Sequence, residues 1–198
     1  MAAKVYVART GTANLASVLA ALKREGAEGL LTEDPQTVLD ADKLVLPGVG
    51  SFGAAMERLR ELGLDEALRT RFQARRATLC ICLGLQVLCD ESEESPGVRG
   101  LGVIHAAVTR FTGVPRVPQL GWNRVLPQPG CRFLQPGWAY YANSYRLEKA
   151  PAGMQAALTP YGGDFVAAVE FGDVLACQFH PELSGAWGRG LIGRWLEA

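Results

Sequence analysis

Residues 79–86 are Leu79-Cys80-Ile81-Cys82-Leu83-Gly84-Leu85-Gln86. This stretch has the pattern of a strand that turns directly into a helix. A cysteine on such a tight turn is pushed out above the carboxyl edge of a sheet, where the helix N-terminus favours its thiolate form. The backbone N–H of Leu83 then points to where an oxyanion would form, and Gly84 lets the helix begin close to its neighbours. These features indicate that Cys82 is a nucleophile. The alternative is a buried cysteine in a core strand.

Outward from this turn, the first half of the chain alternates short apolar strands with apolar residues at helical spacing. Such alternation predicts right-handed crossovers and a parallel sheet that is covered on both faces. The predicted strands are residues 5–8, 29–31, 43–46 and 78–81. The predicted helices cover residues 15–22 (ending at Gly26), 51–62 (with Ser51 as the cap) and 83–88.

From about Gly100 onward the chain reads as strands joined by turns rich in glycine and proline. We expect strands at residues 103–108, 116–126, 138–146, 165–171 and 174–179, then a C-terminal helix from about Ala186. The predicted fold class is therefore α/β, in a single domain over residues 1–198. It has a mostly parallel central sheet, helices on both faces, and antiparallel additions in the C-terminal half.

The composition is that of an ordinary globular protein. Among 198 residues, 48% are hydrophobic, and 20 Lys and Arg balance 20 Asp and Glu. A net charge of zero argues against a nucleic-acid or anionic-membrane surface as the main partner. The most apolar stretch, residues 79–89, is shorter than the roughly 18 residues of a spanning helix, and the N-terminus lacks a signal-peptide pattern. We therefore expect a soluble, cytoplasmic protein.

The five cysteines do not have the spacing of a zinc site. Cys80 and Cys82 are too close for an ordinary structural disulfide, and no histidine follows nearby to complete a set of metal ligands. Free thiols in a reducing compartment fit this pattern better. We expect no metal and no cofactor.

A thiol nucleophile needs a base, and the chain has two histidines, His105 and His180. His105 lies within an apolar strand and is interpreted as structural or superficial. His180 follows an apolar strand, and Pro181 fixes a turn that brings Glu182 within reach of the imidazole. The alternative is a strand end with two exposed polar residues. Together with Cys82, the pair favours a Cys-His-Glu hydrolase.

A glycine-rich loop, Pro47-Gly48-Val49-Gly50-Ser51-Phe52, follows another predicted strand at the same sheet edge. Two glycines around one residue allow backbone N–H groups to turn into a cavity, as an oxyanion hole requires. The alternatives are a phosphate-binding loop, which would lack the lysine of a P-loop, and a plain tight turn.

Residues 82–86 together with His180-Pro181-Glu182 resemble the class I (triad) glutamine amidotransferases. Further segments resemble the branch of this family that serves histidine biosynthesis: residues 11–18, 47–52, 92–94, 117–123 and 140–145. The resemblance runs nearly end to end. It implies the three-layer, flavodoxin-like fold of that family.

The resemblance also implies a reaction and the residues that perform it. The Cys82 thiolate would attack the side-chain amide of glutamine, His180 would protonate the leaving ammonia, and Glu182 would hold the imidazole. A γ-glutamyl thioester would form and hydrolyse to glutamate. The implied oxyanion donors are the backbone groups of Val49, Gly50 and Leu83, and the implied glutamine-binding residues are Gln86, Glu94, Ser144, Tyr145 and Arg146.

Members of this branch pass ammonia to a (βα)₈-barrel cyclase, which makes imidazole glycerol phosphate and aminoimidazole carboxamide ribotide. The resemblance thus implies a heterodimer with such a cyclase. The implied interface residues are Gln119, Trp122, Asn123 and Tyr140. A tryptophan in this position is equally consistent with core filling.

The chain departs from the family pattern at Arg9, Cys80, Leu183, Gln119 and Asn143. None of these departures falls on the triad residues Cys82, His180 and Glu182. Three alternatives remain. They are a glutaminase subunit of another synthase (pyridoxal phosphate, anthranilate or aminodeoxychorismate), a catalytically silent scaffold, and a cysteine hydrolase that acts on γ-glutamyl peptides.

Overall fold

Five parallel strands form one half of the central sheet, in the order β2-β1-β3-β4-β12. This computed structural model describes residues 2–11 and 14–198. The strands are β1 (Ala3–Ala8), β2 (Ala27–Thr32), β3 (Leu44–Gly48), β4 (Thr78–Cys82) and β12 (Val174–Cys177). The helices between them are α1 (Leu15–Arg24), α2 (Pro35–Asp40), α3 (Phe52–Glu61), α4 (Leu64–Gln73) and α5 (Leu83–Gln86).

The other half of the sheet continues from β12 with antiparallel neighbours, in the order β11-β10-β7-β8. These strands are β7 (Gln119–Pro127), β8 (Gly137–Asn143), β10 (Gln155–Pro160) and β11 (Asp164–Phe171). A separate three-stranded sheet contains β5 (Cys89–Ser92), β6 (Ile104–Arg110) and β9 (Tyr145–Leu147). The chain closes with the 3₁₀ turn η1 (Pro181–Leu183) and α6 (Gly185–Glu197). The predicted α/β class with antiparallel additions is confirmed.

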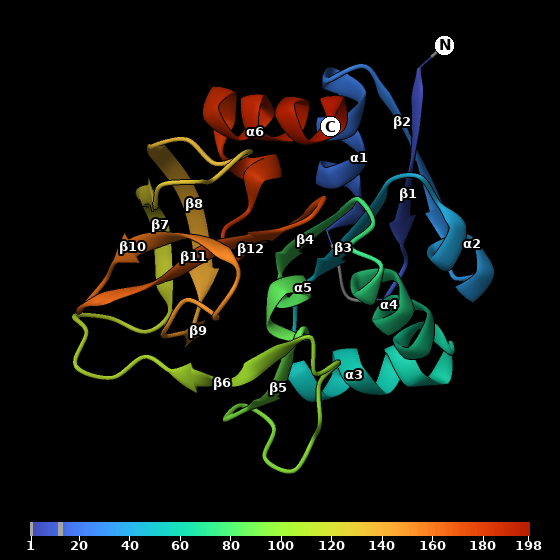
Figure 1. The fold of residues 1–198 in the computed structure, drawn as a ribbon. Helices are drawn as coiled ribbons and strands as arrows, with labels where there is room; N and C mark the ends of the chain where they lie inside the picture. Colours follow the sequence, from blue (N-terminus) through green and yellow to red (C-terminus); the bar gives the residue numbers. More distant parts are fainter. Residues whose placement is uncertain (1, 12–13) are drawn as a thin grey trace.

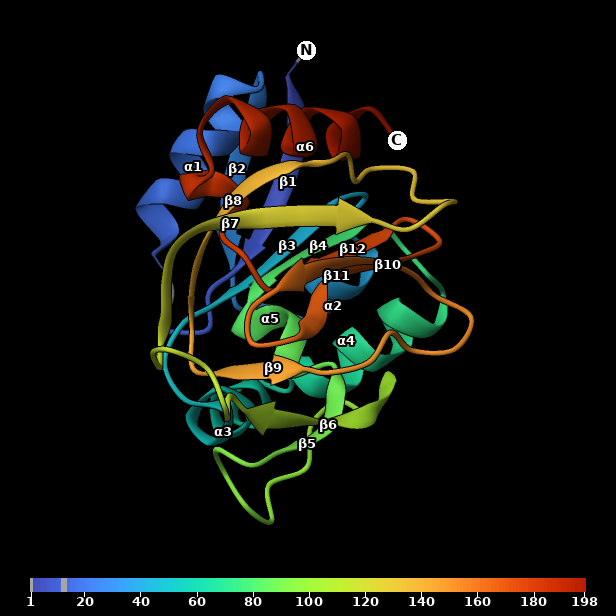
Figure 2. The same cartoon turned by 90° about the vertical axis from the view of Figure 1, so that its left-hand side faces the viewer.

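Helices cover the parallel strands on both faces, as Figures 1 and 2 show. One hydrophobic cluster joins α1 and α6 to one side of the strands, and the other joins α2, α3, α4 and α5 to the opposite side. Within β4 the faces alternate: Leu79 and Ile81 belong to the first cluster and Cys80 to the second. Because both faces are buried, the strand is apolar throughout, which is the pattern that the sequence shows.

Local signals also place the ends of two helices where the sequence predicts them. Ser51 caps α3, with its side-chain oxygen accepting from the N–H of Ala54, and Gly26 follows α1 with a φ of 79°. Asn14 caps α1 by accepting from Ser17. Thr12 and Ala13, which belong to the family-like segment 11–18, lie outside the described residues.

The predicted helix over residues 83–88 is wrong in its length, because α5 ends at Gln86. The carbonyls of Val87 and Leu88 accept instead from the backbone N–H groups of Leu101 and Ile104, at 2.8 and 2.9 Å. This pairing draws the chain out of the helix and into β5.

The predicted strand over residues 138–146 is also wrong, because it breaks at Ser144 into two strands of different sheets. The carbonyl of Ser144 accepts from the N–H of Phe111, and β9 pairs with β6 rather than with β7. This crossing carries residues 142–145 along one rim of the carboxyl edge of the sheet.

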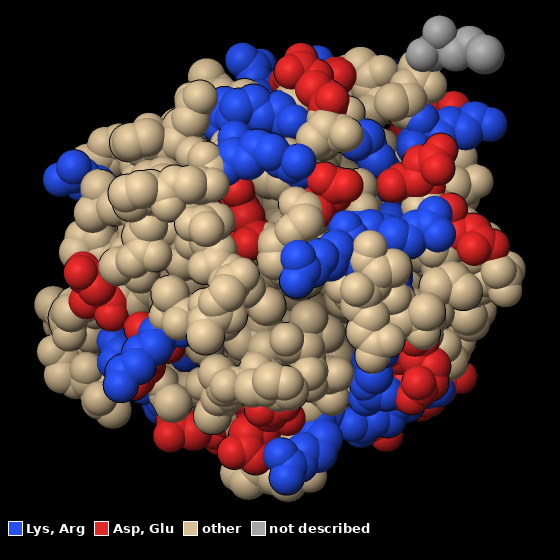
Figure 3. Space-filling view, in the orientation of Figure 1, with Lys and Arg blue, Asp and Glu red and all other residues tan. Residues whose placement is uncertain are grey.

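The surface carries charges of both signs. On the face drawn in Figure 3, lysine and arginine side chains are interspersed with aspartate and glutamate, without a field of one sign. Within the part of the chain that the structure describes, no helix has the length and apolar character to cross a bilayer. The same residues contain no group of three or more His, Cys, Asp or Glu side chains arranged to hold a metal ion.

Candidate active site

The turn between β4 and α5 holds Cys82 in a conformation that non-glycine residues rarely adopt, with φ 53° and ψ −107°. Two glycines make this turn possible. A Cβ on Gly84 would lie 2.2 Å from the carbonyl oxygen of Leu46, and one on Gly48 would lie 2.9 Å from the Cβ of Leu83. The helix therefore starts directly against β3. Strain at a single residue of this kind is typical of functional sites.

His180 follows β12 and lies beside the turn. Its Nδ1 is 2.9 Å from Oε1 of Glu182, and its ring lines the same cavity as Cys82. Its backbone N–H donates to the carbonyl of Tyr140, which ties the histidine to β8. The side chains of His180 and Glu182 are 8% and 3% exposed, so the ion pair is shielded from water. The structure thus brings the three predicted triad residues together.

Two opposing effects act on the pKa of His180. Burial lowers it, but hydrogen bonds to Cys82 and Glu182 outweigh burial and raise the pKa to about 10. At neutral pH the ring therefore carries a proton, and it faces the sulfur as an imidazolium. An imidazolium beside a cysteine supports a thiolate nucleophile and holds a proton ready for a leaving group.

A cavity of about 290 Å³ opens at the triad. That is about ten times the ~30 Å³ that one water occupies in the liquid, which suits a molecule of amino-acid size. Its walls come from the β3–α3 loop, the β4–α5 turn, the turn after β5 and the crossing from β8 to β9. The lining residues are Val49, Gly50, Cys82, Leu83, Gln86, Glu94, Ala142, Asn143, Ser144, Tyr145 and His180.

Four of the five residues implied for glutamine binding line this cavity, and Arg146 does not. The Arg146 guanidinium lies over the ring of Phe111, 4.9 Å from its centroid, and pairs with Glu148 at 3.0 Å. Strand alternation in β9 turns its side chain away from Tyr145. Glu94 also caps a helix, because its Oε2 accepts from the N–H of Phe52 at 2.7 Å.

The three residues implied as oxyanion donors lie around the sulfur. Leu83 is the first residue of α5, so its N–H is one of the groups that a helix N-terminus leaves without a partner inside the helix. Val49 and Gly50 face the same cavity across from it, and Gly50 has a φ of 99°. The loop and the helix start therefore both line the cavity that contains Cys82.

The four residues implied as interface lie on β7 and β8, but they are not equally accessible. Trp122 is 55% exposed and packs edge-to-face on Tyr140, with ring centroids 6.2 Å apart. The core-filling alternative for Trp122 is therefore wrong. Asn123 is half-buried and donates to the carbonyl of Pro160. Gln119 is buried opposite Asn143, which lines the cavity, and its amide group has no hydrogen-bond partner among the described residues.

The remaining residues that the sequence singles out are outside the cavity lining. His105 is exposed and pairs with Asp90, which confirms that it is superficial. Cys80 is buried beneath Gly84, and burial strongly raises the pKa of its thiol. Arg9 pairs with Glu33 at 3.7 Å, and Leu183 is 39% exposed near the triad.

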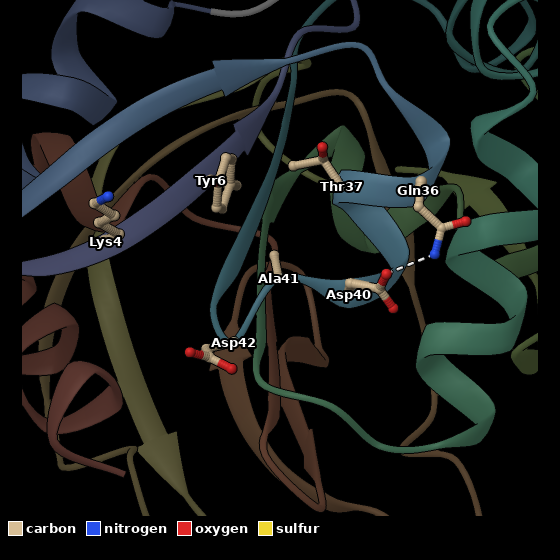
Figure 4. Close-up of a pocket in the computed structure, with 7 residues that line it drawn as sticks. All are labelled: Lys4, Tyr6, Gln36, Thr37, Asp40, Ala41 and Asp42. Atoms are coloured by element: carbon tan, nitrogen blue, oxygen red, sulfur yellow. Dashed lines mark hydrogen bonds between the residues drawn. The ribbon is translucent and has the colours of Figure 1, made fainter.

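A larger hollow of about 410 Å³ lies elsewhere, between β1 and α2. Figure 4 shows its side chains around an open depression, with a hydrogen bond between Gln36 and Asp40. The residues that line it include neither a cysteine nor a histidine, so we do not assign the triad chemistry to it.

One residue at the site has no place in the sequence-based prediction. Gln178 is fully buried at the end of β12, and its side-chain Nε2 is 3.7 Å from Sγ of Cys82. The signal that indicates it is an amide side chain within an apolar strand, two residues before His180, because a buried polar group needs a partner.

Comparisons with known proteins agree with this geometry. Residues 4–116, more than half of the chain, match the model of the CobB/CobQ-like glutamine amidotransferase domain. The chain is 40% identical to the imidazole glycerol phosphate synthase subunit HisH of Symbiobacterium thermophilum, over 98% of this chain and 93% of the relative. It is 43% identical to the subunit HisH of Escherichia coli K12, over 98% of each chain.

Solved structures share the fold at lower identity. A crystal structure of a glutamine amidotransferase has a TM-score of 0.78 and 24% identity, and the match covers 98% of this chain and 97% of that one. PurLQS from Thermotoga maritima has a TM-score of 0.76 and 17% identity, with 100% and 99% covered. The fold, the family model and the relatives together show that the chain belongs to the HisH family of imidazole glycerol phosphate synthase glutaminase subunits, which are class I glutamine amidotransferases.

Proposed function

We propose that this chain hydrolyses glutamine through Cys82, His180 and Glu182 and delivers the ammonia to a cyclase subunit. The observation that carries this proposal is the buried His180–Glu182 pair, which lies with a strained cysteine at one amino-acid-sized cavity. Cys82 is almost 100 residues away in sequence from the neighbouring pair His180 and Glu182, and packing alone gives no reason for them to meet.

The first half of the reaction forms a thioester. The Cys82 thiolate attacks the side-chain amide carbon of glutamine, and the N–H groups of Leu83 and of the Val49–Gly50 loop stabilise the oxyanion. His180 donates its proton to the amide nitrogen, the carbon–nitrogen bond breaks, and ammonia leaves. A γ-glutamyl thioester and a neutral imidazole remain.

The second half restores the enzyme. The neutral His180 takes a proton from water, and the resulting hydroxide attacks the thioester carbon. The sulfur leaves as a thiolate, and glutamate is released. Glu182 holds one tautomer of the ring and stabilises the imidazolium at the start and end of the cycle.

Gln86, Glu94, Ser144 and Tyr145 are proposed to bind glutamine, since they line the cavity with hydrogen-bonding groups. Arg146 has no direct contact with the cavity in this proposal. Its guanidinium would act only by bracing β9 through Phe111 and Glu148.

We further propose a heterodimer with a (βα)₈-barrel cyclase that makes imidazole glycerol phosphate and aminoimidazole carboxamide ribotide. Large apolar side chains exposed near the cavity support this: Val49, Leu120, Trp122 and Leu183. A partner seated there would cover them and receive ammonia before it meets bulk water. Trp122 and Tyr140 would contact the partner directly, whereas the buried Gln119 would lie behind them.

Two coarser features complete the proposal. Residues 1–198 form a single amidotransferase domain, which agrees with relatives of nearly the same length. The protein acts in the cytoplasm, where its five free cysteines suit a reducing environment. The proposed reaction uses protein groups alone, with no cofactor.

The test compares two nitrogen sources in the synthase reconstituted with its cyclase. Cys82→Ser should lower glutamine-dependent synthesis on the order of 10⁴-fold and leave synthesis from added ammonium unchanged, because only the nitrogen supply is lost. His180→Ala should behave likewise, and the exposed His105→Ala is the control that should change neither. An equal fall of both activities in Cys82→Ser would contradict the role of Cys82.

The same reconstitution decides between the remaining alternatives. A silent scaffold would release no glutamate from glutamine at any partner concentration. A hydrolase of γ-glutamyl peptides would cleave such peptides without a partner. A subunit of another synthase would fail to co-purify with the histidine-pathway cyclase.

A further inference from the structure

A chain of amide groups runs behind the nucleophile. Nε2 of Gln178 donates to Sγ of Cys82 at 3.7 Å, and Oε1 of Gln178 accepts from Nε2 of Gln86 at 2.9 Å. Nε2 of Gln86 also donates to the carbonyl of Tyr145 at 3.2 Å, and the same carbonyl accepts from Asn143 at 3.0 Å. We name Gln178, Gln86, Asn143 and the Tyr145 carbonyl the amide relay.

The direction of the amide relay is fixed at the end far from the sulfur. A backbone carbonyl can only accept, so Gln86 has to turn its NH₂ group toward Tyr145. The second hydrogen of that NH₂ group is donated to Gln178, which presents its oxygen to receive it. Gln178 is consequently left with its own NH₂ group toward Cys82, and it cannot flip without breaking the contact with Gln86.

Because the amide groups are buried, their orientation affects the stability of the Cys82 thiolate. Gln178 is 0% exposed and Gln86 is 5% exposed, so water cannot replace an amide that is removed. A donor that faces sulfur stabilises the anionic thiolate more than the neutral thiol, because hydrogen bonds to a charged acceptor are roughly twice as strong. The proton of His180 is transferred to the leaving group during the reaction. The amide proton of Gln178, in contrast, stays on its nitrogen.

We propose that Gln178 is a positioning residue of this glutaminase, whose side-chain N–H holds the Cys82 thiolate in an orientation that Gln86 enforces. The inference rests on the proposed role of Cys82 as the nucleophile. Gln178 is not itself among the residues that line the cavity but contacts two of them, Cys82 and Gln86, from behind, so it acts through the sulfur.

The relay also restricts what Gln86 can offer to a ligand. Both hydrogens of its amide are committed to Tyr145 and Gln178, so only its oxygen is free to face the cavity. Gln86 therefore acts as an acceptor toward a donor group of the substrate.

The test measures the alkylation of Cys82 by iodoacetamide as a function of pH, without glutamine, in the reconstituted synthase. Mass spectrometry of the peptide that contains residue 82 separates it from the other thiols. Gln178→Met keeps a similar volume and removes the donor. Its profile should move to higher pH, with alkylation at pH 7 about tenfold slower, as expected for one lost hydrogen bond to a charged group. The partly exposed Cys131 is the internal reference, and its rate should stay unchanged.

The Gln178→Met and Gln86→Met profiles can be read directly because the surrounding titratable groups stay the same in these two variants. The groups that face the cavity or pack against the sulfur-bearing strand are His180, Glu182, Glu94, Tyr145, Cys80 and Cys177. None of them is substituted. Gln178→Met should also co-elute with the cyclase in size-exclusion chromatography, as the wild type does, which shows that the variant folds and docks.

Two further variants, Gln178→Glu and Gln86→Met, separate the proposed role from a simple folding defect. Gln178→Glu keeps the shape and can still accept from Gln86, but it presents a negatively charged oxygen to the sulfur. The lost donor and the like-charge repulsion should together shift the profile in the same direction and farther than in Gln178→Met. Gln86→Met should shift it as well, because Gln178 is then free to turn. A packing role alone would leave the profile of the neutral Gln178→Met unchanged, and that result would overturn the proposal.

Failure of this inference differs from failure of the proposed function. If Cys82→Ser abolishes glutamine-dependent synthesis while the Gln178 variants alkylate and turn over normally, only the positioning role is wrong. If Cys82→Ser retains glutaminase activity, the proposed function is wrong and the inference falls with it.

Discussion

At Cys82 the backbone is held in a left-handed conformation that a cysteine does not prefer, and the neighbouring glycines provide the space. A Cβ at position 84 would meet the carbonyl oxygen of Leu46, a backbone atom that cannot move aside without disturbing β3. The contact between β3 and α5 therefore has no room for any side chain at residue 84.

The first prediction is that Gly84→Ala lowers the free energy of unfolding by about 2 kcal/mol or more, because overpacking against backbone is poorly relieved. Chemical denaturation monitored by circular dichroism measures the change. Gly193→Ala in α6 is the matched control, since its Cβ would meet only the end of the Glu25 side chain. That control should be neutral or slightly stabilising. Equal stability of the two variants would contradict the close approach at Gly84.

The second prediction concerns His180 and pH. Its pKa in the folded protein is about 10, above the ordinary value of 6.5. A raised histidine pKa gives stability that is fully present below the unfolded pKa and is lost as the pH rises through the folded pKa. We therefore expect the free energy of unfolding of the wild type, relative to His180→Gln, to fall as the pH rises from about 6.5 to about 10. Urea titrations of both proteins at several pH values measure this difference, and a difference that is constant with pH would contradict it.

Among the elements, α4 is held by a buried cation that has no acidic partner in its contacts. The guanidinium of Arg71 donates to the carbonyls of Val38 and Ala41, near the end of α2, and to Ala77 and the Thr78 hydroxyl, at the start of β4. Burial lowers the pKa of Arg71 to about 10. The side chain of Arg71 thus connects α4 and the end of α2 to the start of the central strand β4.

The third prediction is that Arg71→Met lowers the free energy of unfolding by about 3 kcal/mol, because several buried carbonyls lose their donor at once. Thermal and urea denaturation measure the loss. Arg24→Met, on the exposed end of α1, is the control and should change stability by less than about 0.5 kcal/mol. A loss in Arg71→Met no larger than in this control would show that water satisfies those carbonyls.

The elements differ in how far the sequence predicts them. The strands that lead to the site are predictable, because β3 and β4 are buried on both faces and are apolar along their whole length. The short α5 and the break at Ser144 are not, because both are decided by pairing with distant backbone at Leu101, Ile104 and Phe111. Contacts of this kind leave no periodicity in the local sequence.

The site itself shows the same division. Cys82 and His180 follow apolar strands, so the carboxyl edge of a parallel sheet brings them together. Gln178 gives only a weak signal, which is a polar residue at the end of a buried apolar strand. Its hydrogen bond to the sulfur of Cys82 depends on the pairing of β12 with β4. Arg146 is an error of the opposite kind, a residue that is predicted to bind glutamine but does not line the cavity. The family resemblance does not determine the face of β9 on which its side chain lies.

At the scale of the whole molecule, the β7–β8 hairpin presents aromatic side chains outward while its other face packs into the core. Trp122 and Trp138 are equally exposed, at 55% each. They differ in position along the hairpin: Trp122 pairs with Tyr140, which is bonded to His180, whereas Trp138 lies two residues farther from the cavity.

The fourth prediction follows from that difference. Trp122→Ala should weaken binding of the cyclase by about thirtyfold or more, as expected for an aromatic hot spot worth about 2 kcal/mol, and leave the melting temperature unchanged. Trp138→Ala, with the same exposure, should weaken it less. Titration calorimetry of each variant with the cyclase gives the affinities. Unchanged binding in Trp122→Ala would place the partner on another surface.

The most direct test of the central claim is to find where a glutamine-like electrophile reacts. A glutamine analogue with a diazoketone in place of the side-chain amide should label one thiol per chain, on the peptide that contains Cys82, as glutaminase activity disappears in proportion. His180→Ala should slow that labelling. Labelling of Cys131 or another thiol instead, or full glutaminase activity after Cys82 has been modified, would contradict the account.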